Sequence, residues 1–407
     1  MAEATQHIEN GQAISGDAAA DQTDWLLPAD SETQPVLSVV MPTLNEEEGI
    51  RECIERVKTA LEELELPGEV VISDSSTDRT PEIAREMGAI VVEPDGEGYG
   101  YAYRYAFERV RGQYIVMGDA DTTYDFEKIP ELLEPVRDGD ADICMGSRLN
   151  GEIRDGSMTT LHQYIGNPVL TAFLNGFYDA GVSDAHSGFR VFSREALETL
   201  DLESDGMEFA SEMIMDAGAK DLEIAEKPII YHEREGEETL DSFRDGWRHV
   251  RFMLVNAPGY LFSVPGVSMG LAGMFVMGLA LGSASLGPFN PGIHSMVLGS
   301  LLVLIGFQVF NMGVFSTVAG DPIQRPTDPL TTKLTEDLQL EQGVTAGLIL
   351  FGAGSAYATF LVARWASSGF TQLPLLMADI VAFITIVVGM QMIFSAFLLS
   401  TIADRTG

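Results

Sequence analysis

Residues 114–121 read YIVMGDAD, a short apolar run that ends in two carboxylates separated by one alanine. Four apolar residues bounded by a glycine predict a buried β-strand, and Asp119 and Asp121 follow its carboxyl end. Hard divalent cations take oxygen ligands, commonly one or two carboxylates together with substrate phosphates. The stretch therefore predicts that Asp119 and Asp121 bind a divalent cation, Mg²⁺ or Mn²⁺, at the end of a buried strand.

Strand-like and helix-like patterns alternate around this stretch, over residues 36–232. The apolar runs that predict strands are residues 36–41, 70–72, 89–92, 114–117 and 143–145. Helices are expected from apolar spacing at residues 50–64, 101–111 and 126–137. A further helix is expected to start at residues 80–81. Repeated βα units predict an α/β, Rossmann-like domain with a mostly parallel sheet and helices on both faces. Ligands of such sheets bind at the carboxyl ends of the strands.

Polar motifs follow the other strands as well, which strengthens a signal that an isolated Asp-x-Asp would give only weakly. They read PTLNEE at 42–47, DSSTDRT at 74–80 and GEGYG at 96–100. Asp74 is placed to accept hydrogen bonds from a nucleobase or ribose, whereas Asp78 is expected to order the turn. Thr80, followed by proline, is expected to cap a helix. The glycines would let backbone N–H groups approach a phosphate, although such a cluster is more often a simple turn and lacks dinucleotide-binding spacing.

The composition changes after residue 258. Long apolar stretches, almost without charge, cover residues 260–282, 295–319, 344–363 and 375–402. A helix needs about 20 residues to cross a hydrocarbon core of about 30 Å. One buried helix of a soluble protein can be this apolar, but four in series predict a transmembrane domain. Asp379, inside the fourth stretch, is expected to face the interior of the bundle.

Basic residues flank the stretches asymmetrically. Those on one side are Arg244, Arg248, Arg251, Arg325, Lys333 and Arg405, and only Arg364 lies on the other. The positive-inside rule then predicts that the α/β domain and the C-terminus are cytoplasmic. Residues 243–254 mix aromatic, apolar and basic side chains, which predicts an amphipathic helix in the membrane interface. Its arginines are expected to anchor it among anionic headgroups, with guidance of a lipid phosphate as an additional role.

These patterns divide the chain into four segments. They are a disordered acidic tail without a signal peptide (1–34), the α/β domain (35–232), a linker with the interfacial helix (233–258) and a four-helix transmembrane domain (259–407). Acidic residues outnumber basic ones 61 to 24, for a net charge of −37, which argues against a nucleic-acid partner and indicates a halophilic protein. Cys53 and Cys144 have no metal-binding spacing and are expected to be core thiols.

The ordered motifs PTLNE, DSSTDRT, GEGYG and GDAD resemble those of family 2 glycosyltransferases of the GT-A fold. Four later motifs look like those of the polyprenyl-phosphate (dolichyl-phosphate) hexose synthases. They are GSR at 146–148, DAHSGFR at 184–190, EFASE at 208–212 and YHER at 231–234. The resemblance covers roughly residues 36 to 258, and the four apolar stretches that follow are similar to the archaeal, membrane-embedded members.

The resemblance implies inverting transfer of a hexose from a UDP-hexose or GDP-hexose to dolichyl or polyprenyl phosphate, for glycoconjugate synthesis or protein N-glycosylation. Residues implied to hold the nucleotide-sugar are Pro42, Asn45, Glu46, Asp74, Gly98 and Asp119. Those implied to bind the acceptor phosphate are Arg148, Ser187, Arg190 and Arg234, and the catalytic set is Asp119, Asp121, Arg148 and Arg190. Membrane lipid is a further expected partner, and a homo-oligomer is compatible with four spans.

Physical reasoning supports the arginines, because a planar guanidinium suits phosphate oxygens. An ion pair with an acid at the sheet edge is the alternative for Arg148 and Arg190. Glu208 and Glu212, one helical turn apart, are expected either to orient those arginines or to belong to a helix face.

Two departures from the family pattern bear on the substrate. The mannosyl enzymes usually continue the Asp-x-Asp with LQHPP, whereas residues 122–126 read TTYDF, which favours UDP-glucose over GDP-mannose. Glu238 and Thr239 stand where the family often has Ser-Lys, so phosphate binding is left to Arg234. The alternatives are a processive polysaccharide synthase, although RDGW at 244–247 does not supply its usual Gln-x-x-Arg-Trp, and a non-catalytic membrane scaffold.

Overall fold

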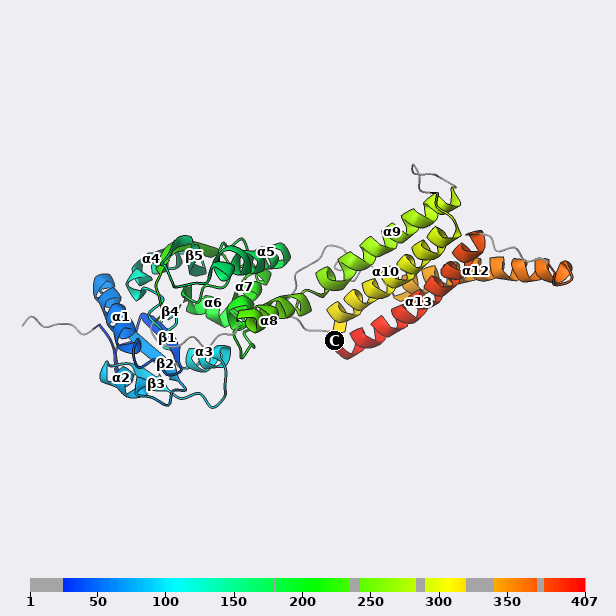
Figure 1. Ribbon diagram of the computed structural model, residues 1–407. Coiled ribbons are helices and arrows are strands. Elements are labelled where there is room, and N and C mark those ends of the chain that lie inside the picture. The colour runs from blue at the N-terminus through cyan, green and yellow to red at the C-terminus, as the bar shows by residue number, and fades with distance from the viewer. Residues whose placement is uncertain are drawn as a thin grey trace, which may run out of the picture.

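The computed structural model describes residues 25–178, 180–234, 242–282, 290–319, 340–371 and 377–406. An α/β domain occupies one end of the molecule and a bundle of long helices the other, with helix α8 (Ser242–Val255) between them (Figure 1). Residues 1–24, 235–241 and 320–339 lie outside the described residues. Four residues used in the sequence analysis therefore have no described structure: Glu238, Thr239, Arg325 and Lys333.

A seven-stranded sheet forms the centre of the α/β domain. In spatial order its strands are β3 (Ile90–Val92), β2 (Gly68–Asp74), β1 (Leu37–Thr43), β4 (Tyr114–Met117), β6 (Arg190–Ser193), β5 (Ile143–Ile153) and β7 (Ile224–Tyr231). The pairs within β3-β2-β1-β4 and the pair β5-β7 are parallel. The mostly parallel sheet is therefore confirmed, whereas β6, which runs antiparallel to both β4 and β5, was not predicted.

Helices cover both faces of this sheet, as predicted. Their bounds are α1 (Ile50–Leu64), α2 (Thr80–Glu86), α3 (Tyr99–Phe107), η1 (Phe126–Lys128), α4 (Ile129–Arg137), η2 (His162–Gly166), α5 (Asn167–Tyr178), α6 (Arg194–Thr199) and α7 (Phe209–Ala219). Successive strand residues point to opposite faces, so Val39 packs with α1 and α4 while Val40 packs with α3 and α7. Cys53 and Cys144 are buried free thiols, as expected.

Two local expectations need correction. Trp25 and Leu27 exchange backbone hydrogen bonds with Gly68, and Leu26 is buried in the core, so the ordered domain begins before residue 35. The N-cap residue of α2 is Arg79, and the carboxylate of Asp78, just before it, accepts from the backbone N–H of Thr80 at 2.9 Å and from its hydroxyl at 2.5 Å. Asp78 therefore orders the turn, as expected, and Thr80 lies inside the helix that it was expected to cap.

Four helices in the described ranges are long and apolar enough to cross a membrane, which confirms the prediction. The spans are Gly259–Leu281 (η3, Gly259–Ser263, with α9, Val264–Leu281), Ile293–Val318 within α10 (Ile293–Ala319), Glu341–Ser367 within α12 (Leu340–Ser367) and Met377–Ile402 within α13 (Met377–Thr406).

Glycines bring the spans together in pairs. A Cβ on Gly273 of α9 would lie 2.5 Å from the carbonyl oxygen of Gly299 in α10, so only glycine allows this approach. Gly347 of α12 faces Gly389 of α13 in the same way. Asp379 is buried, as predicted, and accepts a hydrogen bond of 3.1 Å from the hydroxyl of Tyr357, which ties α13 to α12.

Candidate active site

The reversed strand β6 explains how distant motifs meet. Arg190, its first residue, lies opposite Met117 of β4 and Met145 of β5. Because β6 enters the sheet where β4 ends at Met117 and where the pairing of β5 with β6 stops at Met145, the residues before β6 lie next to those that follow Met117 and Met145. The segment 184–190, hereafter the 184–190 loop, therefore lies beside both the Asp119–Asp121 motif and Arg148.

The paired acids are held by their neighbours. The Tyr99 hydroxyl donates to Oδ1 of Asp119 at 2.8 Å, and the backbone N–H and hydroxyl of Thr123 donate to Oδ1 of Asp121 at 3.2 and 2.5 Å. Burial, together with the nearby negative charge of Asp121, raises the pKa of Asp119 to about 7. Thr122 adopts a positive φ of 63°, which turns the chain sharply between the two acids and the next segment.

These acids fit a divalent cation. In the described part of the chain the Oδ2 atoms of Asp119 and Asp121 accept no hydrogen bond, and a cation would relieve the repulsion that raises the pKa of Asp119. The described residues contain no cluster of three or more His, Cys, Asp or Glu side chains able to hold a metal. The remaining ligands would have to be substrate phosphates and water, as is common for Mg²⁺.

Arg234 lies between the carboxylates of Glu46 and Asp121. Its Nη2 donates to Oε1 of Glu46 at 2.6 Å, and its Nη1 is 3.8 Å from Oδ2 of Asp121. Burial raises the pKa of Glu46, although the Arg234 charge opposes this shift. The structure thus brings together one residue predicted for the nucleotide, one for the metal and one for the acceptor phosphate.

The loops after β1 and β2 are tied to each other. Thr43 donates to Oδ1 of Asp74 at 2.7 Å, and Oδ1 of Asn45 accepts from the backbone N–H of Thr77 at 2.9 Å. Asn45 has a positive φ of 61°, a conformation that asparagine tolerates better than most residues. Pro42, Asn45, Glu46 and Asp74 are therefore neighbours at one edge of the sheet, and their contact with a nucleotide stays a prediction.

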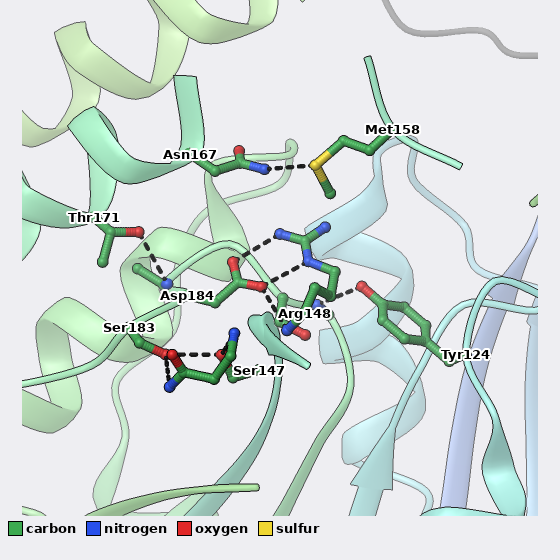
Figure 2. A network of polar contacts seen from close by, with 12 residues as sticks. Tyr124, Ser147, Arg148, Met158, Asn167, Thr171, Ser183 and Asp184 are labelled. Carbon is green, nitrogen blue, oxygen red and sulfur yellow. Dashed lines mark hydrogen bonds and ion pairs between the residues drawn. The ribbon is translucent and has the colours of Figure 1, made fainter. Parts of the chain in front are cut away.

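Arg148 makes the ion pair that was considered as its alternative role. Its Nε and Nη2 each donate to Asp184 at 2.8 Å, and its backbone N–H donates to the same carboxylate at 3.0 Å (Figure 2). Its guanidinium lies 5.3 Å from the centre of the Tyr231 ring. Burial alone would raise the pKa of Asp184, but the Arg148 charge and these hydrogen bonds hold it below its ordinary value. Nη1 is the guanidinium nitrogen left over for a ligand.

Arg190 makes no ion pair among the described residues. It is completely buried, and its Nε and Nη2 donate to the carbonyl oxygens of Ser187 and Ala185 at 2.9 and 3.0 Å. Burial lowers its pKa to about 10. Its Nη1 and the Oγ of Ser187 are buried without a hydrogen-bond partner among the described residues. Buried donors are normally satisfied, so these two donors in one loop are available to a polar ligand.

Sequence reasoning missed two tyrosines at this site. Tyr99 holds Asp119, and the hydroxyl of Tyr124 accepts the backbone N–H of Gly188 at 2.8 Å. A Cβ on Gly188 would lie 3.2 Å from Oδ2 of Asp119, so the 184–190 loop contacts the motif that is expected to bind metal. The available signal was position alone, since Tyr99 lies in GEGYG and Tyr124 three residues after Asp121.

The glycine motif has a packing role. A Cβ on Gly98, whose φ is 124°, would lie 2.1 Å from the carbonyl oxygen of Asp205, which accepts from the N–H groups of Gly100 at 2.9 Å and Tyr101 at 3.2 Å. Glu212, on α7, accepts from the backbone N–H groups of residues 203 and 204, so it holds that segment and does not orient the arginines, which was one of its two expected roles. Nucleotide binding by Gly98 stays a prediction.

Helix α5 connects this site to the membrane domain. Its Thr171 accepts the backbone N–H of Ala185 at 3.2 Å, and its Phe177 stacks on Tyr260 at the start of the first span, with ring centres 4.6 Å apart. The exposed large apolar side chains of η2, α5 and the residue before them are Leu161, Tyr164, Ile165, Val169 and Phe173. Exposed apolar side chains gathered on neighbouring helices of a membrane protein fit contact with lipid.

A mostly parallel sheet with paired acids at its carboxyl edge, followed by four spans, defines a membrane-bound glycosyltransferase of the GT-A type. Residues 38–201 match the family model for glycosyl transferase family 2, and residues 318–403 match the model for the glycosyltransferase family 2 C-terminal transmembrane region. The chain is 60% identical to the low-salt glycan biosynthesis hexosyltransferase Agl6 of Haloferax volcanii, over 98% of this chain and 96% of that protein. The chain therefore belongs to glycosyltransferase family 2.

Two further relatives each match about half of the chain. A dolichyl-phosphate hexose transferase of Haloferax volcanii is 36% identical over 52% of this chain and 89% of its own length. A dolichol-phosphate mannosyltransferase of Pyrococcus furiosus is 27% identical over 50% of this chain and 59% of its own length. The resemblance read from the sequence motifs is thereby confirmed at the level of the family.

Proposed function

We propose that the protein transfers a hexose, with inversion, from a nucleotide-sugar to dolichyl or another polyprenyl phosphate at the cytoplasmic face of the membrane. TTYDF at 122–126 favours UDP-glucose as donor over GDP-mannose. The names of the relatives support a hexosyl donor and a dolichyl phosphate acceptor. The reaction would supply a lipid-linked sugar for glycan assembly.

One contact carries the proposal. The 184–190 loop, with the unsatisfied donors of Ser187 and Arg190, approaches Asp119 at Gly188. A donor diphosphate at the paired acids and an acceptor phosphate at this loop would therefore be neighbours. Placing two reactants in this way can supply much of a rate enhancement, because it removes the entropy of a bimolecular encounter.

The donor side depends on Asp119 and Asp121. A divalent cation held there would neutralise the departing nucleoside diphosphate. Tyr99 and Thr123 fix the two carboxylates in place by hydrogen bonds, so that little reorganisation is needed when the donor binds. Arg234, already paired with Glu46, adds positive charge next to Asp121.

The acceptor needs no protein nucleophile. A lipid monophosphate has a second pKa of about 6, so it carries nearly two charges at neutral pH and can attack the anomeric carbon itself. Burial raises the pKa of Cys53 and Cys144 to about 12, which makes these thiols poor nucleophiles. Nη1 of Arg148, Nη1 of Arg190 and the Ser187 hydroxyl would hold the phosphate. A single displacement of this kind converts an α-linked donor into a β-linked lipid product.

The bilayer would present the acceptor from the side of α5. Its outer face is apolar and exposed, while its inner face bonds to the 184–190 loop. A phosphate at the headgroup level can then reach the loop while its polyprenyl chain stays in lipid. The basic residues near the first span favour the cytoplasmic side, where nucleotide-sugars are made.

The test is a product assay with the full-length protein in liposomes. Liposomes with dolichyl phosphate receive labelled UDP-glucose, UDP-galactose or GDP-mannose, with Mg²⁺, Mn²⁺ or EDTA. We expect one β-linked dolichyl phosphosugar that requires the metal. A polymer made without added dolichyl phosphate would indicate a polysaccharide synthase, and an α-linked product would refute the single displacement. Asp121→Asn should abolish the product, whereas the half-buried Asp125→Asn, four residues away, serves as the matched control for the loss of one acidic charge.

A further inference from the structure

Three polar side chains link the 184–190 loop to the helix that leads into the membrane. The Oγ of Ser211 on α7 lies 3.2 Å from Nε2 of His186 in the loop and 3.0 Å from Nδ1 of His249 on α8. The two imidazole rings are perpendicular, with centres 5.0 Å apart. We call this set the His-Ser-His bridge.

The bridge is enclosed by protein. Ser211 is completely buried, and burial lowers the pKa of His186 to about 3, so that this ring is neutral at any physiological pH. A serine hydroxyl has one proton to donate and two lone pairs, so it can bond to both rings whenever at least one of the two facing ring nitrogens carries a proton. Two ring nitrogens therefore lie within hydrogen-bonding distance of one buried hydroxyl, and both lose that partner if the hydroxyl is removed.

The bridge joins two parts of the molecule with different tasks. His186 directly precedes Ser187, whose Oγ has no hydrogen-bond partner among the described residues. It lies four residues before Arg190, whose Nη1 also has none. On the other side, α8 ends at Val255, and the first span begins at Gly259. A shift of α8 at the membrane would therefore be passed to the loop through Ser211.

A second set of contacts supports the same connection. Helix α5 holds the loop through Thr171 at Ala185, and through Asn175, whose side chain bonds the backbone N–H and carbonyl of Val182 at 3.1 and 2.7 Å. The same helix packs on Tyr260 of the first span. The loop is thus bonded, directly or through Ser211, to both helices that meet the start of the membrane domain.

We propose that His186, Ser211 and His249 are positioning residues that fix the 184–190 loop relative to the membrane anchor, so that a lipid phosphate meets the donor in reactive alignment. This inference rests on the proposed function for the identity of the acceptor. A displacement of about 1 Å in such an alignment can cost about 100-fold in rate. The bridge would leave donor binding untouched, because it contacts neither Asp119 nor Asp121 in the described structure.

The variants separate a lost hydrogen bond from a lost ring. His249→Leu and Ser211→Ala break the bridge. His249→Asn keeps a polar atom close to the position of Nδ1 and is the matched variant that can preserve it. We expect His249→Leu and Ser211→Ala to lower transfer to dolichyl phosphate by about 10- to 100-fold. The KM for the nucleotide-sugar and the slow hydrolysis of the nucleotide-sugar without acceptor should stay unchanged. His249→Asn should recover most of the transfer rate.

The double variant adds an independent criterion. Residues that act through one network are not additive, so His249→Leu combined with Ser211→Ala should be no slower than the more damaged single variant. The inference is overturned if His249→Leu transfers sugar at the wild-type rate. It is also overturned if transfer and acceptor-free hydrolysis fall together, because that pattern reports general damage to the fold.

Hydrogen exchange distinguishes a failure of this inference from a failure of the proposed function. In the wild-type protein in liposomes, backbone amides of residues 183–190 should exchange slowly. His249→Leu should speed their exchange at least about 10-fold, and His249→Asn should not. If wild-type protein makes no dolichyl phosphosugar but this exchange pattern holds, the proposed acceptor is wrong and the bridge still positions the loop. Unchanged exchange in His249→Leu refutes the bridge whatever the acceptor is.

Discussion

The ion pair of Arg148 and Asp184 allows the sharpest test of how the 184–190 loop is held. Asp184→Asn keeps the size of the side chain but removes its charge, and it turns one acceptor toward the guanidinium into a donor. Both partners are buried, with side-chain exposures of 8% for Arg148 and 0% for Asp184. The carboxylate accepts three hydrogen bonds of 2.8, 2.8 and 3.0 Å from Arg148 alone.

The magnitude follows from the burial. Breaking a buried pair by neutralising one partner costs about 3–5 kcal/mol, because the other charge is left buried without compensation. For a domain of about 150–250 residues, each kcal/mol shifts the melting temperature by about 2–4 °C. The apparent melting temperature of the α/β part should therefore fall by about 6–20 °C.

The assay heats the full-length protein in detergent and monitors its unfolding by near-ultraviolet circular dichroism. Glu152→Gln is the matched control, because Glu152 lies on the same strand and pairs with Arg154 at 2.9 Å while both side chains are more than half exposed. Exposed pairs contribute little, so this control should change the melting temperature by less than about 2 °C. Equal shifts in the two variants would show that the Arg148–Asp184 pair does not hold the loop.

The remaining predictions concern the acids, the loop and the spans. Because the pKa of Asp119 is raised to about 7, a metal that binds this carboxylate below about pH 7 would have to displace its proton. The affinity for Mn²⁺, measured by calorimetry with UDP present, should therefore rise about 10-fold from about pH 6 to pH 8. An affinity that does not change with pH contradicts this. Gly188→Ala should lower transfer by about 10-fold because its Cβ would lie 3.2 Å from Asp119, whereas Gly176→Ala on α5, with nothing within 4 Å, should not. Gly273→Ile should disrupt the pairing of α9 with α10 and reduce thermal stability in detergent, while Gly270→Ile, in open space on the same helix, should be tolerated; equal losses would refute the role of close helix contact.

Much of the fold was predictable because it depends on local patterns. Short apolar runs predicted β1, β2, β3, β4 and the start of β5, since a strand buried on both faces is made mostly of apolar residues. The four spans were predictable for a similar reason, because lipid requires about 20 apolar residues in a row. The motifs after the strands were placed correctly at one edge, because parallel strands all end there.

The missed features depend on contacts between distant residues. The short strand β6 follows a loop and runs against its neighbours, and nothing in residues 190–193 distinguishes a reversed strand from a parallel one. The partner of Arg148 lies 36 residues away, and an acidic chain offers many other carboxylates. Tyr99 and Tyr124 look like ordinary aromatic residues in sequence, and their roles come from the hydroxyl groups that reach Asp119 and Gly188.

The sequence by itself determined the family, the order of strands and helices from β1 to the start of β5, the position of the paired acids and the division between a water-facing and a lipid-facing half. Each of these is written in composition or in spacing over a few residues, where burial and helix geometry act directly. Only the tertiary structure decided that β6 is reversed, that Arg148 pairs with Asp184 and that a histidine from the membrane-proximal helix reaches the 184–190 loop through Ser211. Those outcomes depend on which distant surfaces pack together, because a buried polar group must find its partner wherever the folded chain brings one within hydrogen-bonding distance.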